Sequence, residues 1–184
     1  LHTLSAFDLT RTRQELGADL RRFGGASLLA ELVLRAASEE ADPALFDQIR
    51  GALARLAQAP DERLDGVLLA ETWALVGRLG FTPSIDGCTA CGRPLAEDED
   101  AFFDYDAGGV LCSHCARPGS VRGAGRIVPA AARRVLADLT QGSAVDIERP
   151  AAHWALLSRF IARHVVDGAT LRSLPFLVEA LEGR

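Results

Sequence analysis

Four cysteines at regular spacing limit the fold of this chain more than any other sequence feature. They form the pattern Cys-x2-Cys-x20-Cys-x2-Cys and are the only cysteines among 184 residues: Cys88, Cys91, Cys112 and Cys115. Each Cys-x-x-Cys places two thiolates on one tight turn, and two such turns supply the tetrahedral set that Zn2+ prefers. Because four protein ligands leave no open position for a substrate, the pattern predicts a structural zinc.

The segment between the two cysteine pairs predicts a small β-hairpin. Residues 101–106 partly alternate between apolar and polar side chains, and residues 106–109 have the composition of a turn. Gly87 and Gly92 flank the first pair and permit the backbone conformations that a turn around a metal requires. Three aromatic side chains are expected to pack the hairpin against the rest of the chain, although one of them could stack on a base: Phe102, Phe103 and Tyr105.

Redox and disulfide roles fit the cysteines less well. Neither pair lies between a strand and a long helix, as a thioredoxin-like pair would. Asp8, Arg11 and Glu15 interrupt any apolar run near the start of the chain, so the sequence shows no secretory signal. Stable disulfides are therefore not expected.

Outside the cysteine segment, apolar residues recur at helical spacing. Asp42-Pro43 is a helix start signal, and Gly24-Gly25 is interpreted as a helix end. The expected helices span residues 10–23, 28–40, 43–59, 61–80, 129–139, 150–166 and 171–181. The expected fold class is therefore mainly α, a bundle of about seven helices with an inserted four-cysteine zinc hairpin of the zinc-ribbon type.

Length and composition support one good core and a small satellite. The chain is 48% hydrophobic, and no apolar run approaches the roughly 18 residues of a membrane span. We expect residues 1–85 and 119–184 to form two parts of one bundle, and residues 86–118 to form the zinc-binding insert. Because the chain contains no methionine and begins at Leu1, we also expect a further N-terminal portion.

Charge is unevenly distributed, although the net charge of -5 is only mildly acidic. Residues 86–106 hold seven acidic residues against Arg93, whereas residues 107–137 hold five arginines and no acid. All 20 basic residues are arginine, whose planar guanidinium suits phosphate. From charge alone, the second segment is either a DNA-binding patch or a solvated loop whose arginines pair with the acidic stretch.

Two groups of arginines supply the candidate contacts to a nucleic-acid backbone. One follows the zinc pattern, and its Arg133-Arg134 pair falls in the opening turns of an expected helix, where backbone amides also favour anions. The other lies on one face of the helix after Pro150. The candidates are Arg122, Arg126, Arg133, Arg134, Arg159 and Arg163.

Catalytic motifs are poorly represented. The chain contains no Gly-x-Ser-x-Gly and no His-Glu-x-x-His, and without lysine it cannot form the usual phosphate-binding loop. His153 and His164 flank an expected helix without an evident partner. We therefore expect no enzyme, and a metal-dependent or thiol-based enzyme would need exposed, reactive thiolates.

Three stretches in a fixed order carry a resemblance to a known family: Cys88-x-x-Cys91-Gly92, Gly108-Gly109-Val110-Leu111-Cys112-x-x-Cys115 and Leu171-Arg172-Ser173-x-x-Phe176-Leu177. Together with the helices they resemble the helical, zinc-bearing C-terminal part of the RecO family of bacterial recombination mediators, over nearly the whole chain. Two departures stand out. The family tail commonly continues with a basic residue where this chain has Leu174-Pro175, and the family's N-terminal OB-fold barrel has no counterpart in these residues.

The resemblance implies a non-enzymatic function in DNA repair and recombination. RecO-like proteins bind single- and double-stranded DNA, anneal complementary strands, associate with RecR, and help to load RecA onto DNA coated by single-strand binding protein. It also implies a structural Zn2+ and a cytoplasmic, nucleoid-associated location without a membrane anchor. The alternative interpretation is a zinc-stabilised protein–protein interaction scaffold that does not touch DNA.

Overall fold

The computed structural model describes residues 6, 12–38, 40–116, 125–166 and 170–182. Its helices are α1 (Gln14–Ala18), α2 (Leu20–Ala36), α3 (Pro43–Gln58), the 3-10 turn η1 (Asp61–Arg63), α4 (Leu64–Arg78), α5 (Ala130–Thr140), α6 (Pro150–Phe160), the π-helical turn η2 (Ile161–Val165) and α7 (Ser173–Glu182). Strands β1 (Ala101–Asp104), β2 (Gly109–Leu111) and β3 (Gly125–Val128) form an antiparallel sheet in the order β2-β1-β3. This architecture confirms the predicted mainly α fold with an inserted cysteine hairpin.

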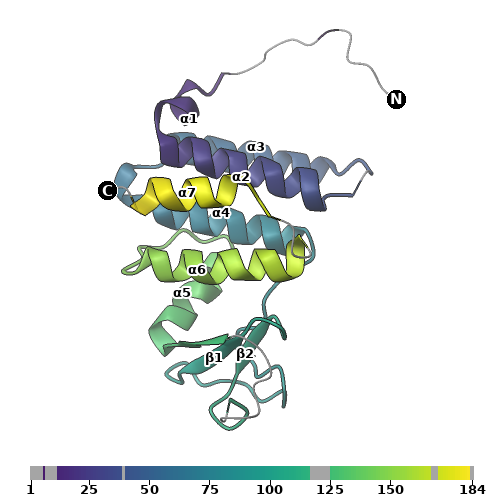
Figure 1. The fold of residues 1–184 in the computed structure, drawn as a ribbon, viewed down its shortest axis with the longest axis vertical. Coiled ribbons are helices and arrows are strands. Elements are labelled where there is room, and N and C mark those ends of the chain that lie inside the picture. Colours follow the sequence, from purple (N-terminus) through teal and green to yellow (C-terminus); the bar gives the residue numbers. More distant parts are fainter. Residues whose placement is uncertain (1–5, 7–11, 39, 117–124, 167–169, 183–184) are drawn as a thin grey trace.

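The helices stack along the long axis of the molecule, and the small sheet lies at one end (Figure 1). Helix α4 is the central element, since it contacts α2, α3, α5 and α6 and buries ten of its own residues. Helix α7, the last in sequence, packs against α2. Among the described residues, no helix combines the length and apolar character needed to cross a membrane.

The predicted helix end at Gly24-Gly25 is wrong, because both glycines lie inside α2. The helix instead begins after Asp19, whose carboxylate accepts hydrogen bonds from the backbone N–H groups of Arg21 and Arg22. A β-carbon on Gly24 would lie 3.2 Å from Leu177 of α7. The glycines therefore permit close packing of neighbouring helices. Thr10, the expected start of the preceding helix, lies outside the described residues.

Two carboxylates fix helix starts elsewhere in the bundle. The predicted start at Asp42-Pro43 is confirmed: Pro43 opens α3, and the Asp42 side chain accepts a hydrogen bond from the Leu45 backbone N–H at 2.9 Å. Glu31 of α2 holds the start of α7, since its carboxylate accepts bonds from the backbone N–H of Arg172 and from both the N–H and hydroxyl of Ser173.

Aromatic side chains join the sheet to the bundle, as the sequence predicts. Phe103 and Tyr105 are 0% and 5% exposed. The Phe103 ring centroid lies 6.3 Å from that of Phe160 on α6, which in turn lies 5.2 Å from that of Trp73 on α4. His164 adds a polar contact, since its Nε2 lies 2.6 Å from the carbonyl oxygen of Tyr105. The hairpin is thus anchored by buried rings.

The third strand was not predicted. β3 pairs with β1 so that Phe103 lies opposite Arg126 and Ala101 lies opposite Val128. The sheet therefore includes residues that the sequence analysis assigned to the second part of the bundle. β3 leads directly into α5 through Pro129, which connects the sheet to the helices a second time.

Candidate functional site: a four-cysteine centre and its arginine surroundings

The four cysteines converge although 20 residues separate the two pairs. Their Sγ atoms all lie within 4.8 Å of one another, and those of Cys91 and Cys112 are 3.9 Å apart. A tetrahedron with metal–sulfur bonds of about 2.3 Å has edges of about 3.8 Å, so the sulfur spacing fits a four-coordinate metal. It is too wide for a disulfide, whose sulfurs lie about 2 Å apart.

Backbone hydrogen bonds shape both cysteine turns. In the first turn, the Cys88 N–H donates to the Arg93 carbonyl and the Gly92 N–H donates to the Cys88 carbonyl, each at 2.8 Å. Gly92 has φ +72°, a left-handed conformation that favours glycine, as predicted. In the second turn, the Cys115 N–H donates to the Cys112 carbonyl at 3.0 Å. The sequence between the ligands thus builds a compact turn on each side of the centre.

The protonation of the thiols depends on these turns. The Cys115 backbone N–H, helped by the Arg93 guanidinium, lowers the pKa of Cys112 to about 6. The nearby sulfurs of Cys112 and Cys91 raise the pKa of Cys115 to about 12. Like charges in one small site oppose simultaneous ionisation, and a divalent cation removes this opposition. The centre is therefore suited to exchanging protons for a metal ion.

Arg93 is a residue of the centre that the sequence analysis left without a role. Its guanidinium pairs with Glu99, and this contact together with Cys112 raises the pKa of Arg93. The signal was present in the sequence, since Arg93 is the single basic residue of the acidic segment 86–106 and directly follows Gly92. A cation at this position offsets part of the charge of the thiolates.

Arg133 is buried and supports the backbone around the first cysteine pair. The residue is 6% exposed, and its guanidinium donates to the backbone carbonyls of Ile85 and Ala96, on either side of the first cysteine pair. A buried guanidinium already bonded to carbonyls is not presented to a phosphate. Arg133 instead ties α5 to the loop that carries the first cysteine turn.

The other candidates on α5, α6 and η2 are exposed. Arg134 makes only a long hydrogen bond, 3.5 Å, to the Glu97 carbonyl. The Arg159 guanidinium lies over the Tyr105 ring at 5.6 Å, and Arg163 donates to Asp106 at 2.8 Å. The structure thus brings Arg159 and Arg163 together at the β1–β2 turn. Arg163 can adjust at little cost because an exposed ion pair is weak, and Arg159 because an exposed cation–π contact contributes only about 0.5–1 kcal/mol.

Arg126 lies on β3 and is half-buried. Its guanidinium donates to the Ala152 carbonyl at 3.2 Å. Arg122, the remaining candidate, lies outside the described residues.

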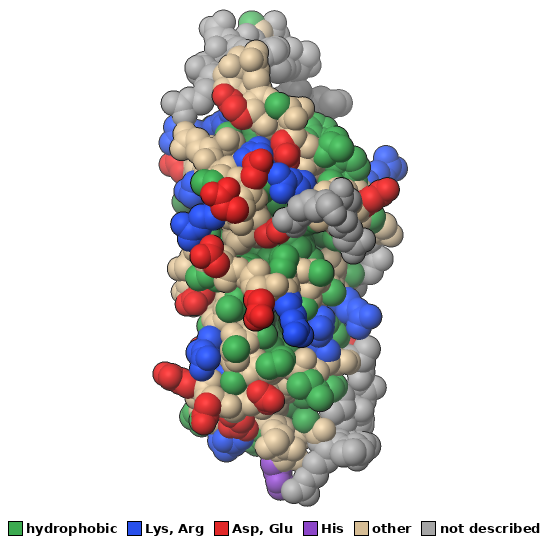
Figure 2. Space-filling view, turned by 90° about the vertical axis from the view of Figure 1, so that its left-hand side faces the viewer, with side chains coloured by type: hydrophobic (Ala, Val, Ile, Leu, Met, Phe, Trp, Pro, Cys, Tyr) green, Lys and Arg blue, Asp and Glu red, His purple; other side chains and the backbone are tan. Residues whose placement is uncertain are grey.

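On the face drawn in Figure 2, acidic and basic side chains alternate over much of the surface, with hydrophobic side chains between them. Any DNA contact on this face is therefore local.

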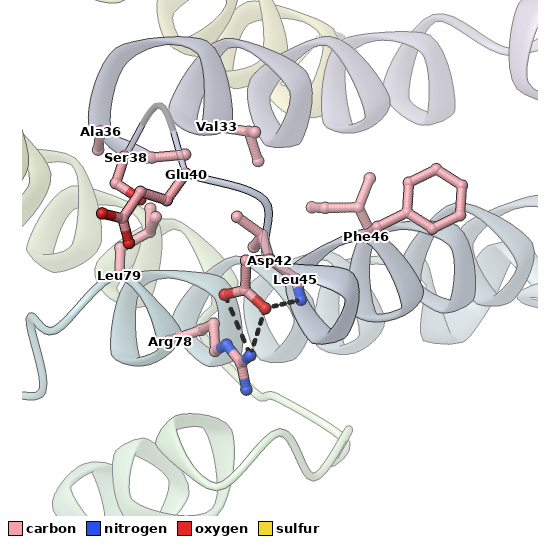
Figure 3. A pocket seen from close by; sticks show the side chains of 11 residues that line it. Val33, Ala36, Ser38, Glu40, Asp42, Leu45, Phe46, Arg78 and Leu79 are labelled. Carbon is pink, nitrogen blue, oxygen red and sulfur yellow. Dashed lines mark hydrogen bonds and ion pairs between the residues drawn. The ribbon is translucent and has the colours of Figure 1, made fainter.

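An apolar groove lies at the opposite end of the molecule, between α2, α3 and α4. Its volume is about 490 Å3, and it is lined by Val33, Leu45, Ile49 and Leu79 among others. Figure 3 shows Arg78 bound to Asp42 among the side chains that line the groove, and the Arg78 Nη2 lies 2.9 Å from the Asp42 Oδ1. Phe46 borders the groove and is 68% exposed. Exposed apolar side chains beside a groove are typical of a protein contact.

Comparisons with known proteins match most of this chain to one family. The family model described as "Recombination protein O C terminal" matches residues 17–175. Three proteins named DNA repair protein RecO are similar: from Streptomyces griseus, 33% identical over 85% of this chain; from Gloeobacter violaceus, 30% over 90%; and from Nocardioides sp., 29% over 89%. The matches span only 56%, 62% and 61% of those relatives.

Proposed function

The chain belongs to the RecO family, matching its C-terminal part, and we propose that it serves as a DNA-binding part of a recombination mediator in DNA repair. The observation that carries this proposal is the family match over residues 17–175. The matched segment includes the four-cysteine centre, the sheet and every described helix from α2 to α6. We propose a non-enzymatic role in the cytoplasm, at the nucleoid, because a mediator acts by binding rather than by bond cleavage.

The metal of the centre is proposed to be Zn2+. Four sulfurs at tetrahedral spacing are the donor set of structural zinc, and they leave no open position for a substrate. Bound zinc would hold the two cysteine turns together and so fix the sheet against α6. Its contribution is to the folding of the surface around it.

The proposed DNA contacts are the exposed Arg134, Arg159 and Arg163, the half-buried Arg126, and Arg122 from the segment outside the described residues. Phosphate contacts by guanidinium groups are independent of sequence and sensitive to salt. Arg159 and Arg163 lie beside the hairpin that the metal stabilises. We therefore propose that the metal and the DNA contacts are linked through the β1–β2 turn.

The proposed wider activity is that of the family. It includes binding of single- and double-stranded DNA, annealing of complementary strands, and loading of RecA with RecR on DNA coated by single-strand binding protein. The second candidate function is a zinc-stabilised scaffold that contacts only proteins. The apolar groove beside Phe46 favours it, because such a surface suits a protein partner better than DNA.

A salt series on this chain tests the proposal. The metal-loaded protein is titrated into labelled single-stranded and duplex DNA over a range of salt concentrations, and the slope of log affinity against log salt is measured. We expect a steep negative slope. Its magnitude should decrease by about 0.7 to 0.9 for each phosphate contact that Arg134→Ala or Arg159→Ala removes.

The control is Arg50→Ala. Arg50 is an exposed arginine on α3, paired with Asp47 at 2.9 Å, far along the chain from the cysteine centre. Its removal alters the net charge equally and should leave the slope unchanged. If the unaltered chain binds neither DNA even at low salt, the scaffold function is favoured and the DNA proposal is rejected.

A further inference from the structure

A pocket of about 350 Å3 lies between β3, α5 and the first turns of α6. It is separate from the cysteine centre and from the apolar groove. Its walls are aliphatic, with Ile127 69% exposed at the mouth and Leu136 and Leu156 at the sides. None of the described residues that line it is acidic. The pocket therefore combines apolar walls with an environment that does not repel anions.

Two arginines border this pocket. Arg126 reaches it from β3 while bonded to the Ala152 carbonyl, and Arg149 reaches it from the residue before α6. The Arg149 side chain is exposed and makes no hydrogen bond or ion pair with any residue that the structure describes. Both guanidinium groups are thus positioned to bind an anion, and one of them is uncommitted.

His153 supplies an independent observation. It lines the pocket, it is only 8% exposed, and its imidazole makes no hydrogen bond within the described part of the chain. Burial, and then the charge of Arg126, lower the pKa of His153. The ring nitrogens are still reached from the pocket, because neither of them is a fully enclosed polar atom without a partner. The imidazole is therefore free to hydrogen-bond a group that enters the pocket.

The N-terminus of α6 points to the same chemistry. This helix of 11 residues has no side-chain cap and no acidic residue in its first turn, and Ala152 of that turn lines the pocket. Helices α2 and α3 begin with an aspartate cap, and the first amide of α5 donates to Asp100 at 2.8 Å. Pro150 has no N–H and the Ala152 N–H donates to the Arg149 carbonyl at 3.1 Å, so the start of α6 attracts an anion mainly through the helix dipole, which no acidic side chain of the first turn neutralises.

We propose that this pocket binds one nucleotide of single-stranded DNA. The phosphate is held by Arg149, Arg126 and the start of α6, and the sugar and base lie against Ile127 and the aliphatic walls. The volume suits a small molecule but not a folded segment. A single strand can turn one nucleotide into a pocket, whereas the bases of a duplex are stacked and paired. The choice of DNA as the source of the phosphate rests on the proposed function.

Binding of short oligothymidylate and of a duplex of the same length tests the proposal. Arg149→Ala should lower single-strand affinity about tenfold, as expected for one charge-assisted hydrogen bond, and duplex affinity less than about twofold. Ala132→Leu, which narrows the pocket without changing charge, should also lower single-strand affinity. Arg50→Ala is the matched control, and circular dichroism verifies that each variant is folded.

Thymidine monophosphate provides a direct probe of the pocket. Its addition to the unaltered chain should shift the NMR signals of the His153 imidazole, and Arg149→Ala should abolish that shift. If Arg149→Ala behaves like Arg50→Ala while DNA still binds, the pocket proposal is overturned and the proposed function stands. If no DNA binds, the proposed function itself fails. If an acidic peptide shifts these signals and the nucleotide does not, the pocket is a peptide site and the nucleotide proposal is rejected.

Discussion

Gly25 lies directly against Leu68: a β-carbon on Gly25 would stand 2.0 Å from Cδ2 of that leucine. Leu68 is 1% exposed and belongs to α4, the central helix. The absence of a side chain at Gly25 therefore sets the distance between α2 and α4. This relationship explains why a glycine pair occurs inside a helix, where glycine otherwise costs stability.

Gly25→Ala should destabilise the protein by about 1–3 kcal/mol, because the methyl group would force Leu68 and its neighbours apart. Gly17→Ala is the matched control, since a β-carbon there meets nothing within 4 Å. That substitution should be neutral or stabilise by about 0.5–1 kcal/mol through helix propensity. Urea unfolding of the two variants makes the comparison, and equal effects would contradict the packing argument.

Arg133 and Arg134 should separate stability from DNA binding. Arg133→Ala removes the guanidinium donor from the carbonyls of Ile85 and Ala96, of which Ala96 keeps the Glu99 N–H, and should lower the free energy of unfolding by about 1–3 kcal/mol. Arg134→Ala should leave stability within about 0.5 kcal/mol of the unaltered chain, since its side chain is exposed. Thermal unfolding measures the first effect, and DNA titration should show the larger loss for Arg134→Ala. The reverse order in either assay would refute this division of roles.

Glu31 should make stability depend on pH. Burial opposes its ionisation, but the hydroxyl and N–H of Ser173 and the N–H of Arg172 outweigh it and lower the pKa of Glu31 below its ordinary 4.5. Because the folded-state pKa is lowered, the stabilisation is complete above the unfolded pKa and is lost as the pH falls through the folded one. Glu31→Gln should cost about 1–2 kcal/mol at neutral pH, and the difference should shrink in acid. A difference that is constant with pH would show that charge is not involved.

Removal of one cysteine should remove the metal and loosen the sheet. Cys112→Ser should abolish stoichiometric zinc, measured by mass spectrometry of the metal content. The free energy of unfolding should fall by about 3 kcal/mol or more when the metal is in large excess over its Kd, or roughly 10 °C in Tm. Ser113→Ala, at the exposed neighbouring position, should change neither quantity. A chelator should reproduce the effect on the unaltered chain and have none on Cys112→Ser.

The sequence predicted those features of the fold that depend on interactions between residues close together in the chain. The cysteine spacing predicted two turns and a shared centre, and Asp42-Pro43 predicted a helix start that depends on one side chain and the next few backbone amides. The aromatic residues of the hairpin were assigned to packing because a small hairpin cannot cover its own rings.

Long-range contacts account for what the sequence did not predict. Gly24-Gly25 has the composition of a helix end, and only the approach of Leu68 and Leu177 from distant helices explains it as a packing site. Arg133 and Arg134 are adjacent and chemically identical, yet their directions on α5 bury one and expose the other. β3 is short and follows a glycine-rich segment, so its pairing with β1 is visible only in the fold.

The packed rings of Trp73, Phe160 and Phe103 also determine whether the hairpin can be separated from the bundle and which of its residues can change in evolution. The hairpin is not a transplantable module, because excision would expose Phe160 to water and leave the Trp73 side of the bundle uncovered. Because Trp73, at 1% exposure, packs on Phe160, its fluorescence can report hairpin docking once the second buried tryptophan, Trp154, is replaced. A descendant of this chain that lost its cysteines would have to keep these rings, since a metal centre would no longer help to hold the hairpin together.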